Sequence, residues 1–282
     1  MKSRRGYISF NLTPESATLR ERAAQMTPPQ PTVRQWLARG LLPGGLRPNR
    51  QDIAPARMLE LIDRYPGLYR HADSLQGEAP PFAREAFAVG GGWLGIVERL
   101  SARLATDPNL VVGQLKEKMG RLTVYLERTS SPEVEAATDA ALDEARAESE
   151  RTCEICGEPG VLEARIRGWV SVRCEPCEAL DVAVEACREL AAYAAGLDLA
   201  AFEAGGESRS PELLLSAAKL HLVRLGGAAE RQPAGRRALL PGVEWARLDL
   251  FRDILGYVKH MTAAEVWYFV RDKLPALEEA LR

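Results

Sequence analysis

Four cysteines near the middle of the chain are the residues best suited to chemistry. They form two Cys-x-x-Cys pairs, Cys153 with Cys156 and Cys174 with Cys177, separated by seventeen intervening residues. This spacing is typical of zinc sites in which four thiolates surround the ion. The sequence therefore predicts one bound Zn²⁺ with these four side chains as its ligands.

The predicted zinc ion has the ligand set of a structural ion. Catalytic zinc keeps one position open for water and usually has a histidine or carboxylate ligand. The three histidines, His71, His221 and His260, all lie outside the cysteine segment. We therefore expect no catalytic residue, and an enzyme ranks third among the hypotheses. It would need a cleft in which a histidine meets a carboxylate or a thiol.

The residues around the cysteines predict a small zinc module over 152–187. Residues 161–167 and 169–173 have strand-like composition and are interrupted by Gly168, which indicates a short hairpin. Residues 178–195 are helical in composition. A metal knuckle, a hairpin and a second knuckle at the start of a helix follow the order of a treble clef, and a zinc ribbon is the alternative. Cys187, on the predicted helix, is expected to be a buried apolar side chain.

The N-terminal part of the chain is basic. Residues 1–57 carry ten Lys and Arg against three Asp and Glu, whereas residues 58–152 carry eleven against sixteen. Helices are predicted over 14–26 and, after Thr32 as N-cap, over 33–40. A basic Pro/Gly loop and a third helix over 55–65 follow. The asymmetry indicates different partners for the two parts, although a preference for arginine on a soluble surface explains it equally well.

The segment at about 15–50 resembles the helix-turn-helix of MerR-type and excisionase-type DNA-binding domains, through its order of elements and the sequence TVRQWLARGLLP. The resemblance implies that Arg34, Gln35 and Arg39 face the major groove and that Arg47 and Arg50 contact phosphate from a wing. A plain helical subdomain is the alternative.

Three glycines, Gly90, Gly92 and Gly95, satisfy the spacing G-x-G-x-x-G. A dinucleotide site needs this signature between a strand and a helix, in a unit that returns to a parallel strand. Since the sequence predicts no parallel alternation here, we expect a glycine turn that leads into an amphipathic helix, and no nucleotide cofactor. A β-hairpin is expected on either side of Gly120, and a long helix from Pro132.

Several motifs between about 57 and 185 resemble a domain of unknown function found in phage and bacterial proteins. They are GGWLGIVERLSARL, VVGQLKEKMGRLTVYL, ESERTCEICGEPG and GWVSVRCEPC. The resemblance implies a zinc-stapled α+β domain and a phage or mobile-element setting, and it brings no known activity.

The C-terminal part is predicted to be helical, with helix starts at Ser210 and at a Thr262–Glu265 capping box. Residues 227–242 read as a basic linker or loop, in which Arg231, Arg236 and Arg237 can contact a polyanion. No run reaches the ~20 apolar residues of a membrane span, and the first residues lack the apolar stretch of a secretory signal.

The sequence thus predicts a mostly helical α+β protein, with a small β-hairpin, the zinc module and helical ends. Its expected units are a basic helix-turn-helix-like region (1–56), an α+β domain that includes the zinc module (57–187) and a helical region (188–282). We expect a cytoplasmic, non-enzymatic binding protein that contacts DNA through its basic N-terminal region and a protein through its acidic centre, with no membrane association. The alternative is a protein-interaction factor, such as an inhibitor or immunity-type protein.

Overall fold

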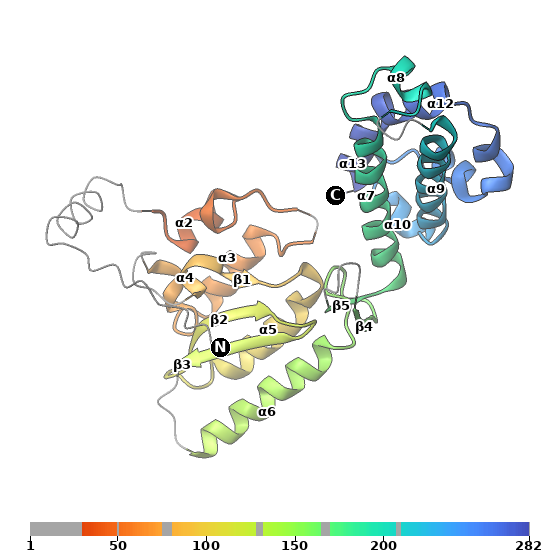
Figure 1. The fold of residues 1–282 in the computed structure, drawn as a ribbon. Coiled ribbons are helices and arrows are strands. Elements are labelled where there is room, and N and C mark those ends of the chain that lie inside the picture. The colour runs from red at the N-terminus through yellow and green to blue at the C-terminus, as the bar shows by residue number, and fades with distance from the viewer. Residues whose placement is uncertain are drawn as a thin grey trace, which may run out of the picture.

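The computed structural model describes residues 30–49, 51–74, 81–127, 132–164, 170–206 and 210–281. Two lobes, each with its own hydrophobic core, lie on either side of the cysteine segment. A single long helix, α7, leads from the cysteines into the second lobe (Figure 1).

A three-stranded sheet forms the centre of the N-terminal lobe. Its strands are β1 (Phe87–Ala88), β2 (Val111–Glu117) and β3 (Leu122–Glu127), in the order β1-β2-β3. β2 and β3 form the predicted antiparallel hairpin. Met119 and Gly120 have φ of 56° and 74°, the positive values that a tight hairpin turn requires.

β1 pairs with β2 in parallel, and helix α5 (Leu94–Leu104) connects them. This short β-α-β unit differs from the expectation that no parallel strand follows the glycine motif. The reason is that β1 has only two residues, which gives too little hydrophobic pattern for a sequence to predict a strand.

Aromatic side chains fill much of the core of this lobe, and helices surround the sheet. They are α2 (Val33–Ala38), α3 (Pro55–Arg64), α4 (Phe82–Glu85) and α6 (Pro132–Ser149). Tyr69 stacks on Phe82 with ring centroids 5.3 Å apart, and both rings are buried. Val33 and Ile53 belong to this same core. Residues 33–53 therefore pack as part of the lobe, and the predicted boundary at 56 does not separate two cores.

The predicted helix-turn-helix is described only in its second half. Helix α2 begins after a capping box, in which Thr32 and Gln35 each accept a hydrogen bond from the backbone N–H of the other. The predicted first helix, 14–26, lies outside the described residues, so its pairing with α2 stays a prediction.

The C-terminal lobe is built of helices in the part that the structure describes. They are α7 (Glu175–Ala194), α8 (Leu199–Glu203), α9 (Pro211–Glu230), α10 (Ala234–Ala238), α11 (Trp245–Asp249), α12 (Ala263–Tyr268) and α13 (Leu274–Leu281). α7 and α9 pack side by side and carry much of the core (Figure 1). A π-helical segment, Phe269–Lys273, joins α12 to α13. The predicted capping box of Thr262 and Glu265 is present at the start of α12.

Two predicted boundaries differ from the structure. The boundary at 187 falls within α7, where Ala179 and Leu190 both lie in the core of the C-terminal lobe. The predicted linker or loop at 227–242 is partly helical, because α9 continues to Glu230 and α10 follows at Ala234–Ala238. Gly226 does not end the helix: a Cβ there would lie 2.2 Å from the backbone N of Arg252, so the glycine allows a close crossing of two backbones.

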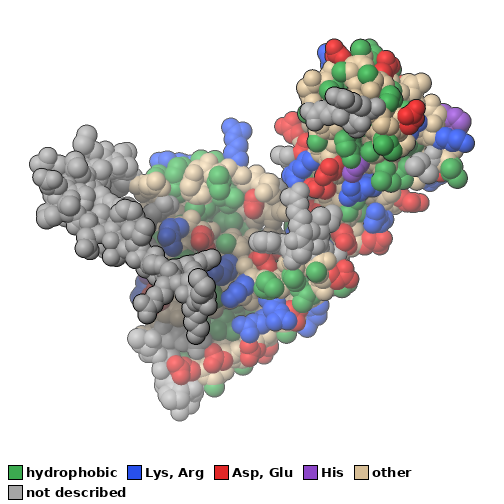
Figure 2. Space-filling view, in the orientation of Figure 1, with side chains coloured by type: hydrophobic (Ala, Val, Ile, Leu, Met, Phe, Trp, Pro, Cys, Tyr) green, Lys and Arg blue, Asp and Glu red, His purple; other side chains and the backbone are tan. Residues whose placement is uncertain are grey.

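The architecture is α+β and mostly helical, as the sequence predicts. On the face shown in Figure 2, basic and acidic side chains are interspersed over both lobes. Within the described ranges, no helix combines the length and the apolar composition needed to cross a bilayer.

Candidate metal centre

The four predicted cysteines converge on one point between the lobes. Their sulfur atoms all lie within 4.8 Å of one another, and the Sγ atoms of Cys156 and Cys174 are 3.5 Å apart. Four sulfurs at about 2.3 Å from a tetrahedral ion are about 3.8 Å apart. Three of the side chains are buried and Cys156 is partly exposed. The cluster therefore fits one metal ion, with all four positions taken by protein.

The first pair lies on a tight turn between α6 and β4 (Val161–Ala164). The backbone N–H of Cys153 donates to the carbonyl of Glu158 at 2.7 Å, and that of Gly157 donates to the carbonyl of Cys153 at 2.9 Å. Gly157 has a φ of 81°, which only glycine adopts without strain. These bonds close the turn so that both sulfurs point inward.

The second pair lies at the start of a helix. Cys174 is the N-cap of α7, and Cys177 lies in its first turn. Free N–H groups and the helix dipole favour negative charge at this end. β4 and β5 (Val170–Arg173) form the antiparallel hairpin between the pairs. The knuckle, hairpin and helix follow the order of a treble clef. Gly168, which was predicted to interrupt the hairpin, lies outside the described residues.

Three consecutive glycines of the N-terminal lobe, Gly90–Gly92 (the glycine triplet), pack directly on the turn that carries Cys153 and Cys156, which is the first knuckle. The N–H of Gly92 donates to the carbonyl of Glu154 at 2.8 Å, and Trp93 Nε1 donates to the carbonyl of Thr152 at 2.8 Å. A Cβ at Gly92 would lie 2.2 Å from the carbonyl oxygen of Cys153, and one at Gly90 would lie 2.3 Å from that of Glu154. The space beside the glycine loop, which a bound nucleotide would need, is therefore occupied by the backbone of the first knuckle.

The C-terminal lobe contacts the second knuckle through two side chains. Arg236 Nη1 lies 2.9 Å from the sulfur of Cys177, and its Nη2 lies 3.8 Å from that of Cys174. Gln232 Nε2 donates to the carbonyl of Pro176 at 2.9 Å. A centre of four thiolates and one divalent ion is dianionic, so a guanidinium at the sulfurs compensates part of its charge. The metal centre thus has one lobe on each side.

A partly buried ion-pair network braces the module further. Arg173 Nη1 lies 2.8 Å from Glu154 Oε2, and its Nε lies 3.3 Å from Asp181 Oδ2. Burial opposes the charge of Arg173, but its bonds to Glu154 and Asp181 outweigh that effect and raise its pKa. The network ties the first knuckle to β5 and α7.

The thiols are not all ionised in the absence of a cation. Burial raises the pKa of Cys174 to about 11. Hydrogen bonds with Cys153 and Cys156, together with burial, raise the pKa of Cys177. Hydrogen bonds from Cys153 and Cys177 lower the pKa of Cys156. At neutral pH the metal-free cluster therefore keeps protons that a metal ion has to displace.

Among the predicted nucleic-acid contacts that the structure describes, Arg34 and Gln35 make interactions within the protein. Arg34 donates to Asp73 through Nε at 2.7 Å and to Asp63 through Nη1, so two carboxylates compensate its charge. Gln35 is used in the cap of α2. The guanidinium of Arg39 stacks on its own helix, 5.5 Å from the ring centroid of Trp36. Arg47 is exposed, and Arg50 lies outside the described residues.

The three arginines of the predicted linker also make contacts within the protein. Arg237 forms a two-pronged ion pair with Asp249, at 2.7 Å and 2.9 Å, and lies over the ring of Trp245. Arg236 contacts the sulfurs of Cys177 and Cys174. Arg231 is exposed and donates to the carbonyl of Gly227. Two of the three are thus occupied internally and do not form a site for a polyanion.

The remaining reactive side chains lie away from the metal cluster. His71 meets Glu127 at 3.0 Å at the end of β3, where the carboxylate is exposed, and His221 lies between Tyr193 and Arg224. Cys187 is buried in the C-terminal core, as predicted, and burial raises its pKa to about 12.

Comparisons with family models, with curated proteins and with solved structures find no match to this chain. The resemblance of residues 57–185 to a domain of unknown function, and that of residues 15–50 to MerR-type and excisionase-type domains, therefore stay predictions.

Proposed function

We propose that this chain is a non-enzymatic binding protein in which a structural Zn²⁺, held by Cys153, Cys156, Cys174 and Cys177, fastens two lobes together. The observation that carries the proposal is the cysteine cluster. Its four sulfurs lie within 4.8 Å of one another, Arg236 of the C-terminal lobe contacts the sulfur of Cys177, and Gly92 of the N-terminal lobe packs against the backbone of Cys153. Four thiolates leave no position for a water molecule or a substrate, and they make the ion a weak Lewis acid. The role of the ion is to fix the surfaces around it, and the protein acts through those surfaces on a partner protein.

The test is metal content combined with stability. We expect one zinc ion per purified chain, and its removal by a chelator should lower the unfolding temperature. Cys174→Ser should abolish stoichiometric zinc binding. Cys187→Ser should bind zinc as the parent does, because the thiol of Cys187 lies in the hydrophobic core of the C-terminal lobe and not in the cysteine cluster. A metal-free chain that unfolds at the same temperature as the loaded chain would overturn the proposal.

A nucleic-acid partner for the basic N-terminal region is the second candidate. The excess of ten basic over three acidic residues in 1–57 supports it, while the two ion pairs of Arg34 weigh against it. If it holds, DNA affinity measured by fluorescence anisotropy should fall steeply with salt and should decrease in Arg39→Ala and Arg47→Ala. Absence of binding at low salt would eliminate this candidate and leave the protein partner.

A further inference from the structure

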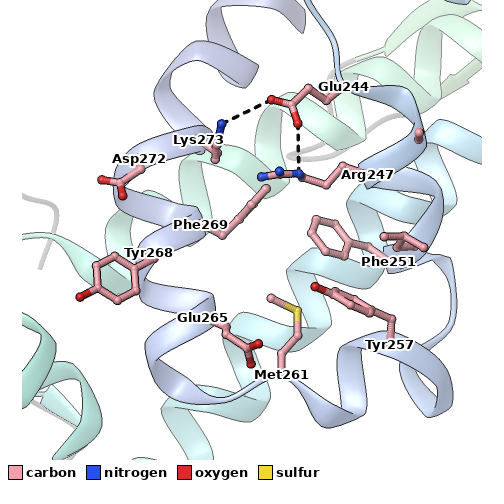
Figure 3. Close-up of a pocket in the computed structure, with 12 residues that line it drawn as sticks. Glu244, Arg247, Phe251, Tyr257, Met261, Glu265, Tyr268, Phe269, Asp272 and Lys273 are labelled. Atoms are coloured by element: carbon pink, nitrogen blue, oxygen red, sulfur yellow. Dashed lines mark ion pairs between the residues drawn. The ribbon is translucent and has the colours of Figure 1, made fainter.

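A groove in the C-terminal lobe has the properties of a docking site for a protein helix. Its volume is about 630 Å³. One wall is the continuous helix that contains α12 and the π-helical segment, and the other is formed by α11 and the residues that follow it (Figure 3). Departures from α-helix geometry such as this π-helical segment often occur at functional sites.

The floor of the groove is aromatic, and part of its apolar surface is open. Phe251 and Phe269 are buried and meet edge to face, with ring centroids 5.1 Å apart. At the edges, Leu250 and Tyr268 expose 50% and 51% of their surface, and Tyr257 exposes 50%. Exposed apolar side chains scattered singly are ordinary, but a group that lines one groove marks an interaction surface.

The charges of the groove are only partly paired with one another. Glu244 pairs with both Arg247, at 3.1 Å, and Lys273, at 3.6 Å. Glu265 and Asp272 are exposed on the opposite wall, on either side of the aromatic pair. Glu265 accepts hydrogen bonds from the backbone N–H and the hydroxyl of Thr262, and Asp272 makes a loose contact with the adjacent Arg271 at 3.8 Å. The groove therefore offers two carboxylates, about 10 Å apart along the helix axis, to a cationic ligand.

The walls also restrict the backbone of the ligand. They are mostly helical, so most of their main-chain groups are already bonded, and none of the described residues that line the groove belongs to a strand that could pair with an extended peptide. An extended ligand would lose hydration of its own backbone without replacement bonds. A helix satisfies its backbone internally and can place apolar residues at i and i+4 between the walls, as in other helix-in-groove complexes.

We infer that this groove binds an amphipathic helix of a partner protein, with apolar or aromatic residues over Phe251 and Phe269 and Lys or Arg residues against Glu265 and Asp272. The inference rests on the proposed binding function and adds the surface and the chemistry of the partner. Cationic side chains gain both from the carboxylates and from the faces of Tyr257 and Tyr268.

The test uses a phage-displayed library of helical peptides selected against the zinc-loaded chain. We expect the enriched peptides to carry apolar residues at helical spacing flanked by Lys or Arg. Their affinity should fall at least tenfold in Tyr268→Glu. It should fall severalfold, with a weaker dependence on salt, in Glu265→Gln combined with Asp272→Asn. Glutamine also suits the third position of a capping box, so this double variant keeps the cap of α12.

The matched control is Leu239→Glu, because Leu239 is 78% exposed and lies outside the groove. Affinity in this variant should be unchanged. Peptides that bind Tyr268→Glu as well as the parent protein, or that are acidic, would overturn the inference while leaving the proposed binding function intact. Failure to enrich any peptide would overturn it as well. A dimer in sedimentation that dissociates in Tyr268→Glu would overturn it by showing that a second copy occupies the groove.

Discussion

Replacing Gly92 by alanine should uncouple the N-terminal lobe from the metal centre. The added Cβ would lie 2.2 Å from the carbonyl oxygen of Cys153, 2.4 Å from the N of Gly157 and 2.6 Å from the N of Cys156. All three are backbone atoms of the turn that presents two zinc ligands, so they cannot move away as a side-chain tip would. Either the turn shifts or the lobe withdraws.

The size of the effect follows from these contacts. Overpacking costs about 1–3 kcal/mol where neighbours can adjust, and loss of the hydrogen bond from Gly92 to Glu154 adds about 1 kcal/mol. We therefore expect the free energy of unfolding to fall by about 3 kcal/mol. At roughly 2–4 °C per kcal/mol, the unfolding temperature should fall by about 6–12 °C. Zinc affinity, measured by competition with a chromophoric chelator, should fall as well.

Gly95→Ala is the control, three positions along the same segment. Gly95 lies within α5, and the nearest atom to its added Cβ is the flexible Arg99 Nη1 at 3.4 Å. Alanine in a helix is favoured over glycine by about 0.5–1 kcal/mol, so this variant should be slightly more stable than the parent. If Gly92→Ala behaves like Gly95→Ala, the packing of the triplet on the knuckle is not what holds the lobe in place.

Two further predictions concern the electrostatics of the centre. Arg236→Ala removes the cation beside Cys177 and should weaken zinc binding about 10–100-fold. Arg231→Ala, which removes an exposed side chain of the same region, should leave zinc binding unchanged. If Arg236→Ala and Arg231→Ala have equal effects in the same chelator competition, the contact of Arg236 with Cys177 does not contribute to zinc binding. Zinc affinity should also rise with pH, because the raised pKa values of Cys174 and Cys177 mean that binding displaces at least two protons at neutral pH. Titrations between about pH 6 and pH 8 should show an increase of about a hundredfold per pH unit, and an affinity independent of pH would contradict the ligand set.

Local pattern was enough to predict the cysteine cluster and many of the elements around it. The Cys-x-x-Cys spacing constrains four side chains within a short segment, and Thr262 with Glu265 is a contact three residues apart. Such features depend on neighbouring residues, which a sequence displays directly. The hairpin at Gly120 and the N-cap at Thr32 belong to the same class.

Contacts between distant segments could not be predicted in this way. Arg236 lies 59 residues from Cys177, and nothing in its surroundings distinguishes it from a surface cation. Gly226 lets another backbone pass close to α9, and the residue that it approaches, Arg252, is 26 positions further along the chain. Arg34 was predicted to contact the DNA major groove, but in the structure its guanidinium pairs with Asp63 and Asp73, which lie on later segments. The unusual run Gly90–Gly92 indicated that another backbone packs closely against it. The sequence did not indicate which segment that is.

The position of Arg236 has a consequence for the order in which the protein is made. A ribosome adds about 5–20 residues per second, so the 59 residues between Cys177 and Arg236 take about 3–12 s to synthesise. During that interval the nascent chain already has its glycine triplet and all four thiols, and it can capture the ion. An ion bound in that interval would be held without the guanidinium of Arg236. The helices that follow would then pack against an anionic centre that is already formed, and Arg236 would be the last group to reach its sulfurs.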